Sequence, residues 1–311
     1  MKTVDIPAFG AQNGDPVTRT LVEALPYVTR WKGCTLVIKL GGSALEAERA
    51  VLEDCVHLRR LGAFPVVVHG GGAAINSWLE RIGKESRFEH GLRVTDEETR
   101  NVARMTLIGE VNASLVAMVN GLGGKAVGLS GLDGPMIRAR YHREYGDIGF
   151  VGEIESVDPE VIRAMAGLGF IPIIAPIGYG PGGEALNINA DTAAADVAVA
   201  LEAEKMIFLT DVVGILNGDG QLISEVSEDE LEGLIADGTV SGGMIPKVKA
   251  CRRAMAGVHQ THIIDGRYPH ALIRELFTVH GVGTMISKRS SEENVPAELP
   301  AVWQSMVRKV L

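Results

Sequence analysis

Short apolar runs alternate with amphipathic stretches along most of this chain. The runs end at glycines or polar residues, which is typical of strands buried on both faces of a parallel sheet. They are residues 35–40, 64–69, 126–130, 170–177, 206–211 and 261–265. Stretches with helical spacing separate them, so the pattern predicts an α/β fold: a three-layer sandwich with a mainly parallel open sheet flanked by helices.

Three further segments have distinct patterns. Residues 16–30 have helical apolar spacing interrupted by Pro26, which predicts an N-terminal helical arm before the first strand. Residues 136–157 mix polar and β-favouring side chains around two glycines, which predicts a hairpin projecting from the sheet. Thr95 with Glu98, and Ser227 with Glu230, have the spacing of capping boxes and predict helix starts.

Composition narrows the classes of function. The chain has 311 residues, 46% apolar, and a formal net charge of −9. No cluster of lysines and arginines suggests a nucleic-acid face or a polybasic membrane anchor. The three cysteines are widely spaced and form no C-x-x-C, and no run approaches the roughly 18 apolar residues of a membrane span. We therefore expect a cytoplasmic protein that binds neither nucleic acid nor membrane.

Candidate chemistry gathers where the apolar runs end. Lys39 lies near the end of one run, one residue before two glycines, and a buried ammonium needs an anionic partner. Glycines 70–72 follow another run and open into a helix, which favours backbone approach to an anion over an ordinary tight turn. Neither the P-loop nor the dinucleotide-binding glycine motif is present. Taken alone, Lys247 in "VSGGMIPKVKA" would be a solvated helix residue.

Several motifs together resemble one enzyme family. They are "VIKLGGSAL", "VVVHGGGAAI", "GLRVTDEETRNVARMTLIGEVN", "LNINADTAAADVA", "FLTDVVGIL", "DGTVSGGMIPKVKA" and "HIIDGRYPHALIRELFTVHGVGTMI", in that order. This order resembles the acetylglutamate kinases of the amino-acid kinase superfamily over roughly residues 16–287. The sequence departs from the common family pattern at Leu40 and Ser43, and a tail follows "GTMI".

The resemblance implies transfer of the ATP γ-phosphoryl group to the γ-carboxylate of N-acetyl-L-glutamate, with Mg²⁺ accompanying the ATP and no dedicated metal site. It also implies four parts: an oligomerisation arm (1–30), an acetylglutamate-binding and dimerisation lobe (31–203), an ATP-binding lobe (204–287) and a tail of unknown role (288–311). The acceptor carboxylate, with a pKa of about 4.3, is already ionised at neutral pH and needs no general base.

Residue roles follow from the same resemblance. Lys39 and Lys247 would draw the phosphoryl group from opposite sides, and Asp191 would hold both lysines, although it could instead be a helix N-cap. The other roles concern binding. For the acceptor they are Gly71, Gly72, Arg93, Asn187 and Asn189; for ATP they are Gly42, Asp211, Val212, Val213, Gly214, Ile215, Leu216, Thr239, Val240 and Ser241. Either asparagine could instead cap the next helix.

Regulation is implied as well. Members with such an arm are typically hexamers inhibited by arginine, which would bind near Tyr27, Glu275, Gly281 and Gly283. An apolar stripe of Leu21, Val22, Leu25 and Val28 supports a partner for the arm. We therefore expect a homo-oligomer, dimer or hexamer, with a nitrogen-signalling protein as a further possible partner. The alternatives are a related kinase acting on aminoadipate or aspartate, and a non-catalytic nucleotide-binding regulator.

Overall fold

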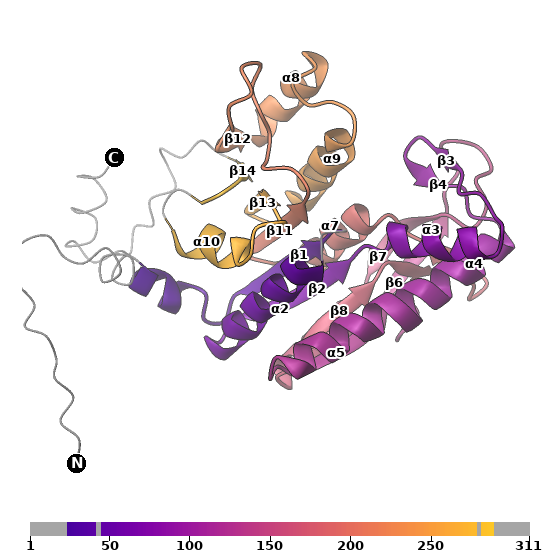
Figure 1. Cartoon of the computed structure of the whole chain (residues 1–311), viewed down its shortest axis with the longest axis horizontal. Helices are drawn as coiled ribbons and strands as arrows, with labels where there is room; N and C mark the ends of the chain where they lie inside the picture. The colour runs from indigo at the N-terminus through magenta and orange to yellow at the C-terminus, as the bar shows by residue number, and fades with distance from the viewer. Residues whose placement is uncertain (1–23, 42–44, 279–280, 289–311) are drawn as a thin grey trace, which may run out of the picture.

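The computed structural model describes residues 24–41, 45–278 and 281–288 (Figure 1). Its centre is a sheet in the order β12-β14-β13-β11-β1-β2-β8-β5. Every neighbouring pair in it is parallel except β13 with β14. The strands are β1 (Thr35–Leu40), β2 (Phe64–His69), β5 (Ala126–Ser130), β8 (Ile171–Ala175), β11 (Lys205–Thr210), β12 (Glu225–Ser227), β13 (Gln260–Asp265) and β14 (Thr284–Ser287).

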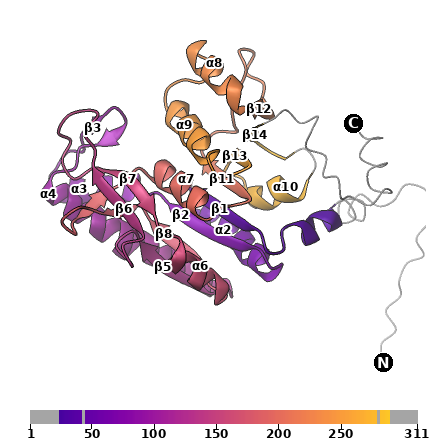
Figure 2. The ribbon, with the colours of Figure 1, turned by 180° about the vertical axis from the view of Figure 1, so that it is seen from behind.

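Helices cover both faces of this sheet, which confirms the predicted α/β sandwich (Figures 1 and 2). One face packs against α2 (Leu45–Arg60), α5 (Ala113–Gly121) and α10 (Ala271–Phe277). The other packs against α6 (Glu160–Gly167), α7 (Ala190–Ala200), α8 (Leu231–Ala236) and α9 (Met244–Ala254). The sheet interior is apolar on both sides because each strand alternates its side chains between the two layers.

Smaller elements lie beyond the end of the main sheet at β5 and β8. A second sheet has the order β10-β9-β6-β7, and β3 pairs with β4. Their bounds are β3 (Phe88–Glu89), β4 (Leu92–Arg93), β6 (Ile137–Tyr141), β7 (Gly152–Val157), β9 (Ile177–Tyr179) and β10 (Ala185–Asn187). The antiparallel pairing of β6 with β7 confirms the predicted hairpin. The remaining helical segments are α3 (Gly72–Arg81), α4 (Glu97–Arg104), η1 (Met105–Asn112) and η2 (Glu228–Glu230).

One predicted helix cap is correct and one is wrong. Ser227 and Glu230 form the reciprocal capping box at η2. Helix α4, however, is capped by Asp96, whose carboxylate accepts the N–H of Thr99. Thr95 is buried and its hydroxyl donates to the carbonyl of Arg93 instead. The chain therefore enters α4 one residue later than the capping pattern indicated.

The continuous helical stretch Glu97–Gly121 corrects one detail of the sequence analysis. By length and composition alone it is apolar enough to cross a bilayer. In the fold this stretch lies along the main sheet, and Asn112 within it donates to the carbonyl of Ile173 on β8 at 2.8 Å. One face is buried against the apolar cluster of α2 and β8 through Leu115 and Val119. The stretch is thus buried along one face only, with 39% of its most apolar 18-residue window buried.

The predicted lobe boundary at residues 203/204 falls between α7 and β11. The main sheet is continuous across it, because β1 pairs with β11 in parallel. Of the predicted arm, residues 24–30 are helical, and Tyr27 packs its ring 6.5 Å from that of Phe277 on α10. Leu25 is 59% exposed, while Leu21 and Val22 lie outside the described residues. The tail beyond residue 288 also lies outside them.

Candidate active site

Strand alternation decides where Lys39 points. On β1 the large apolar side chains Leu36, Ile38 and Leu40 pack on the α2 face, whereas Val37 packs on the α7 and α9 face. Lys39 has the same parity as Val37, so its side chain leaves the strand toward α7 and α9. It is 8% exposed, and a buried ammonium there requires a negative partner.

That partner is Asp191, in the first turn of α7. Lys39 Nζ lies 2.7 Å from Asp191 Oδ1, and Lys247 Nζ of α9 lies 3.6 Å from Asp191 Oδ2. The Asp191 carboxylate thus bridges two ammonium groups from widely separated segments. Burial opposes ionisation, but the two lysines outweigh it and lower the pKa of Asp191. The Lys39–Asp191–Lys247 cluster therefore places two basic side chains on one carboxylate.

The capping role considered for Asp191 belongs to Asn189. Asn189 Oδ1 accepts the N–H groups of Asp191 and Thr192 at 2.9 and 3.0 Å. This leaves the carboxylate of Asp191 to the lysines. It also commits the side-chain oxygen of Asn189 to the helix, so only its amide nitrogen remains for the predicted contact with the acceptor.

The glycines after β1 and β2 have packing reasons of their own. A Cβ at Gly71 would lie 2.4 Å from Leu107 Cδ2, so a side chain there would require the Leu107 side chain of η1 to move. A Cβ at Gly41 would lie 2.7 Å from the Leu209 carbonyl oxygen. The backbone N–H of Gly41 donates to the same oxygen at 3.2 Å. Gly72 begins α3, which has no acidic residue in its first turn. Gly42, predicted to contact ATP, lies outside the described residues.

Arg93 is a buried cation held by neutral groups. Its Nη1 donates to Ser86 Oγ at 2.7 Å and its Nη2 to the Gly72 carbonyl at 3.2 Å. The guanidinium carbon lies 4.7 Å from the ring centroid of Phe88. Burial lowers the pKa of Arg93. No carboxylate pairs with Arg93 within the ranges that the structure describes, so it can accept an anion beside the glycine turn.

Asn187, at the end of β10, reaches the same region. Its Nδ2 donates to Thr95 Oγ1 at 3.2 Å, two residues along the chain from Arg93. Among the predicted acceptor-binding residues, contacts thus join Arg93 with Gly72 directly and with Asn187 through Thr95. The sequence did not indicate that Ser86 and Thr95 contact these residues. The only signal for Thr95 was a polar residue inside "GLRVTD", which the capping pattern assigned to a helix start.

The predicted ATP-binding residues lie in two segments. In 211–216 the chain turns sharply: Gly214 has φ +142°, and a Cβ there would lie 2.6 Å from Thr284 Oγ1. Ile215 is buried and its N–H donates to Thr284 Oγ1 at 2.8 Å, whereas Val212 and Leu216 are exposed. The second segment, 239–241, precedes α9. In it Val240 is buried, while Thr239 donates its N–H to Asp237 at 2.9 Å.

His69 is buried beside the glycine turn but is not placed for proton transfer. Its Nδ1 lies 2.6 Å from the Gly70 carbonyl oxygen and its Nε2 lies 3.2 Å from Asn112 Nδ2. Burial lowers the pKa of His69 to about 4. The neutral ring therefore donates through Nδ1 and accepts through Nε2, which uses both nitrogens in structural contacts.

Of the residues predicted to bind arginine, Glu275 belongs to a buried chain of polar groups with His262 and Lys205. Glu275 accepts from His262 Nδ1 and from the Val282 N–H, both at 2.6 Å. Lys205 Nζ lies 2.9 Å from His262 Nε2, and burial lowers the pKa of His262 to about 4. Gly281 has φ +58°, and a Cβ on it would lie 2.7 Å from Glu275 Oε2. A Cβ on Gly283 would lie 2.1 Å from the Ile263 carbonyl oxygen, which explains both glycines by close packing.

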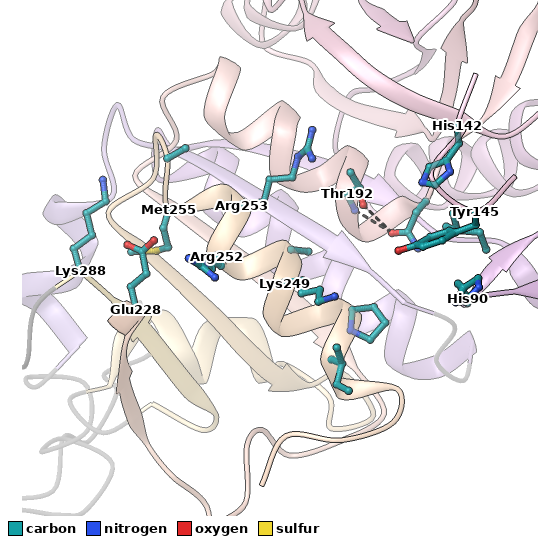
Figure 3. A pocket seen from close by; sticks show the side chains of 17 residues that line it. His90, His142, Tyr145, Thr192, Glu228, Lys249, Arg252, Arg253, Met255 and Lys288 are labelled. Carbon is teal, nitrogen blue, oxygen red and sulfur yellow. Dashed lines mark hydrogen bonds between the residues drawn. The ribbon is translucent and has the colours of Figure 1, made fainter. Parts of the chain in front are cut away.

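A pocket of about 900 Å³ runs along α9 beside the Lys39–Asp191–Lys247 cluster (Figure 3). His90, His142 and Tyr145 from the two hairpins line one end, and Glu228 and Lys288 line the other. Tyr145 stacks on both imidazoles, with ring centroids 4.3 Å from His90 and 5.0 Å from His142. Lys39, Asp191 and Lys247 do not line this pocket, which therefore flanks the cluster.

Comparison with known proteins shows the family to which the chain belongs. The family model described as "Amino acid kinase family" matches residues 35–265, so the chain belongs to that family and has its fold. Within it, the chain belongs to the acetylglutamate kinases. It is 49% identical over 285 residues to the acetylglutamate kinase of Heliobacterium modesticaldum, covering 86% of this chain and 97% of that one. The resemblance drawn from the motifs is confirmed.

Two solved structures are also similar. N-acetylglutamate synthase from Neisseria gonorrhoeae, complexed with coenzyme A and N-acetyl-glutamate, is 29% identical with a TM-score of 0.80. The match covers 89% of this chain and 64% of that chain. The same synthase complexed with coenzyme A and L-arginine is 27% identical with a TM-score of 0.77, covering 89% and 66%. Both therefore contain a segment that has no counterpart in this match.

Proposed function

We propose that this chain transfers the γ-phosphoryl group of ATP to the γ-carboxylate of N-acetyl-L-glutamate, giving N-acetyl-L-glutamyl 5-phosphate in the second step of arginine biosynthesis. The observation that carries the proposal is the buried Asp191 bridged by Lys39 and Lys247. A carboxylate oxygen attacks the γ-phosphorus, the bond to the β-γ bridging oxygen breaks, and ADP leaves. No proton is transferred, which agrees with His69 being held in structural contacts.

The central difficulty of this reaction is charge. An anionic acceptor must approach a polyanionic triphosphate, and fixed cations lower that barrier. Lys39 acts from the acceptor side and Lys247 from the nucleotide side, with Asp191 fixing their spacing. Because the lysines are held before substrate binds, no energy is spent on reorienting them during the reaction.

Acceptor binding follows from Arg93 and its neighbours. The guanidinium binds the α-carboxylate of acetylglutamate through two parallel hydrogen bonds, and Gly71, Gly72, Asn187 and Asn189 supply polar contacts. The nucleotide lies against segments 211–216 and 239–241. Mg²⁺ accompanies ATP and is held mainly by phosphate oxygens and water. Within the described ranges no cluster of three or more His, Cys, Asp and Glu residues could hold a metal.

Regulation and assembly extend the proposal. Arginine inhibits by binding near Tyr27, Glu275, Gly281 and Gly283. A structurally similar synthase has been solved in a complex with L-arginine. The chain assembles as a dimer or hexamer. Exposed apolar side chains support this assembly, including Met105 at 58% and Leu25 at 59% exposure. A nitrogen-signalling protein is a further partner, and the enzyme works in the cytoplasm.

A coupled assay of ADP release tests the activity. Purified protein, ATP and Mg²⁺ are supplied with N-acetylglutamate, glutamate, aspartate or aminoadipate in parallel. We expect turnover with N-acetylglutamate at least tenfold above that with the other acceptors. Equal activity with free glutamate would overturn the substrate assignment. Activity with aminoadipate or aspartate alone would favour a related kinase, and none with any acceptor would favour a nucleotide-binding regulator.

A further inference from the structure

Thr95 joins three segments that are distant in the sequence. It lies just after β4, with 0% of its surface exposed. Its hydroxyl donates to the Arg93 carbonyl at 2.7 Å and accepts from Asn187 Nδ2 at 3.2 Å. Its backbone N–H donates to the Ile148 carbonyl at 2.9 Å, and its carbonyl accepts from the Phe150 N–H at 2.6 Å. Thr95 therefore contacts β4, β10 and the β6–β7 hairpin at once.

The backbone of Gly149 packs directly against that of Thr95. A Cβ on Gly149 would lie 2.2 Å from the Thr95 carbonyl oxygen, and Gly149 has φ +77°. Any other residue would push the hairpin away from Thr95. On its far side the hairpin bonds β10, because the Phe150 carbonyl accepts from the Asn187 N–H at 2.9 Å. The strand positions of Arg93 and Asn187 are thus linked through both the Thr95 hydroxyl and the hairpin backbone.

The hydroxyl makes a contact that other groups do not replace. Helix capping does not explain Thr95, because Asp96 caps α4. The described contacts of the Asn187 side chain consist of the bond to Thr95 Oγ1, which directs its amide nitrogen. The guanidinium of Arg93 donates to Ser86 and to Gly72, while the backbone carbonyl of Arg93 accepts from the Thr95 hydroxyl. Without the hydroxyl, the amide of Asn187 loses its acceptor and is free to rotate.

We propose that Thr95 is a positioning residue for the acceptor site, and that its hydroxyl sets the relative placement of Arg93 and Asn187. The proposal rests on the proposed function, in which these two side chains contact N-acetylglutamate. Thr95 itself does not touch the acceptor. Its effect is on the affinity for the acceptor, and ATP binding at segments 211–216 and 239–241 is independent of it.

A matched pair of variants tests this role. Thr95→Val keeps the shape and removes the hydroxyl, whereas Thr95→Ser keeps the hydroxyl. We expect Thr95→Val to raise the KM for N-acetylglutamate about tenfold, the change produced by about 1.4 kcal/mol, with the KM for ATP and kcat within about threefold. Thr95→Ser should retain nearly the wild-type KM. Calorimetric titration of each variant with N-acetylglutamate in the absence of ATP gives a readout independent of turnover.

A double variant distinguishes a positioning role of Thr95 from a general loss of structure. In an Asn187→Ala background, Thr95→Val should have a clearly smaller effect on acceptor affinity, because part of its action passes through Asn187. If Thr95→Val does not fold by circular dichroism, Thr95→Cys replaces it, since a thiol is a poor hydrogen-bonding group. Equal losses for ATP and acceptor would mean a structural role only and would overturn the proposal. Wild-type affinity in Thr95→Val would do the same.

Titration of the wild-type protein separates failure of the proposed function from failure of the positioning role of Thr95. If the wild-type protein binds and phosphorylates N-acetylglutamate but Thr95→Val matches it, the proposed function stands and the positioning role is wrong. If the wild-type protein neither binds nor phosphorylates N-acetylglutamate, the proposed function itself fails and the positioning role fails with it.

Discussion

Asn189 Oδ1 accepts the backbone N–H of Asp191 at 2.9 Å at the start of α7. This contact divides two tasks between neighbouring residues that sequence reasoning could not separate. The asparagine satisfies the free N–H groups of the helix, and the aspartate is left to bridge Lys39 and Lys247. Burial opposes ionisation of that carboxylate, but Lys39 and Lys247 outweigh it and lower the pKa of Asp191.

Replacing Lys247 by Ala should reduce kcat about a hundredfold or more, because a preorganised cation at a phosphoryl transition state is worth several kcal/mol. The fold should persist, since the side chain is 21% exposed. Steady-state kinetics measures the effect. Lys249→Ala, on the same helix, is the matched control and should keep near-normal turnover. A Lys247→Ala enzyme as fast as that control would refute the assigned role.

Replacing Arg93 by Ala should raise the KM for N-acetylglutamate about tenfold or more through loss of a bidentate contact, with the KM for ATP little changed. Arg87→Ala on the same hairpin is the control, because the Arg87 side chain is 74% exposed and faces Glu89. Varying each substrate at saturating levels of the other gives both constants. A collapse of ATP affinity instead would mean that the two lobes are assigned in reverse.

Asp191→Asn should make stability less dependent on acid pH. The folded-state pKa of Asp191 is lowered, so its ionised form adds stability above the unfolded value of about 3.9, and this is lost as pH falls through the folded value. The variant lacks this contribution, so its urea unfolding free energy should fall less steeply than the wild type below about pH 4. If the unfolding free energies of the two proteins fall equally steeply as the pH is lowered, the bridging contact is contradicted.

Asp191→Asn should also lower turnover about tenfold or more, because the lysines lose their fixed spacing.

Deleting residues 1–30 should leave an active dimer that arginine no longer inhibits. Within the described range, Tyr27 of the arm packs on Phe277, next to the α10 segment that carries Glu275. Light scattering measures the assembly, and an arginine titration of the kinase assay measures inhibition. The full-length protein serves as the reference. If the full-length protein is itself a dimer insensitive to millimolar arginine, the proposed regulation is wrong.

Much of the fold was predictable because its signals are local. Continuous apolar runs bounded by turn residues predicted strands such as β1, β2 and β11, and all of them lie in one mainly parallel sheet. The hairpin of β6 and β7 followed from glycines between β-favouring residues. Local capping chemistry was less decisive. At α4 two adjacent residues could each serve as the cap, and burial of Thr95 decided in favour of Asp96.

The sequence by itself determined the kinds of groups available at the site: single lysines in glycine-rich contexts, an aspartate opening a helix, and an arginine in a polar hairpin. Which of these meet was decided only by the tertiary structure, because β1, α7 and α9 contribute one residue each to the Lys39–Asp191–Lys247 cluster. Strand alternation turned Lys39 toward α7, and Asn189 freed Asp191 to receive it. The link from Thr95 to Asn187 spans 92 residues and carries no local signal, since a hydrogen bond between distant segments leaves no periodic trace in the chain.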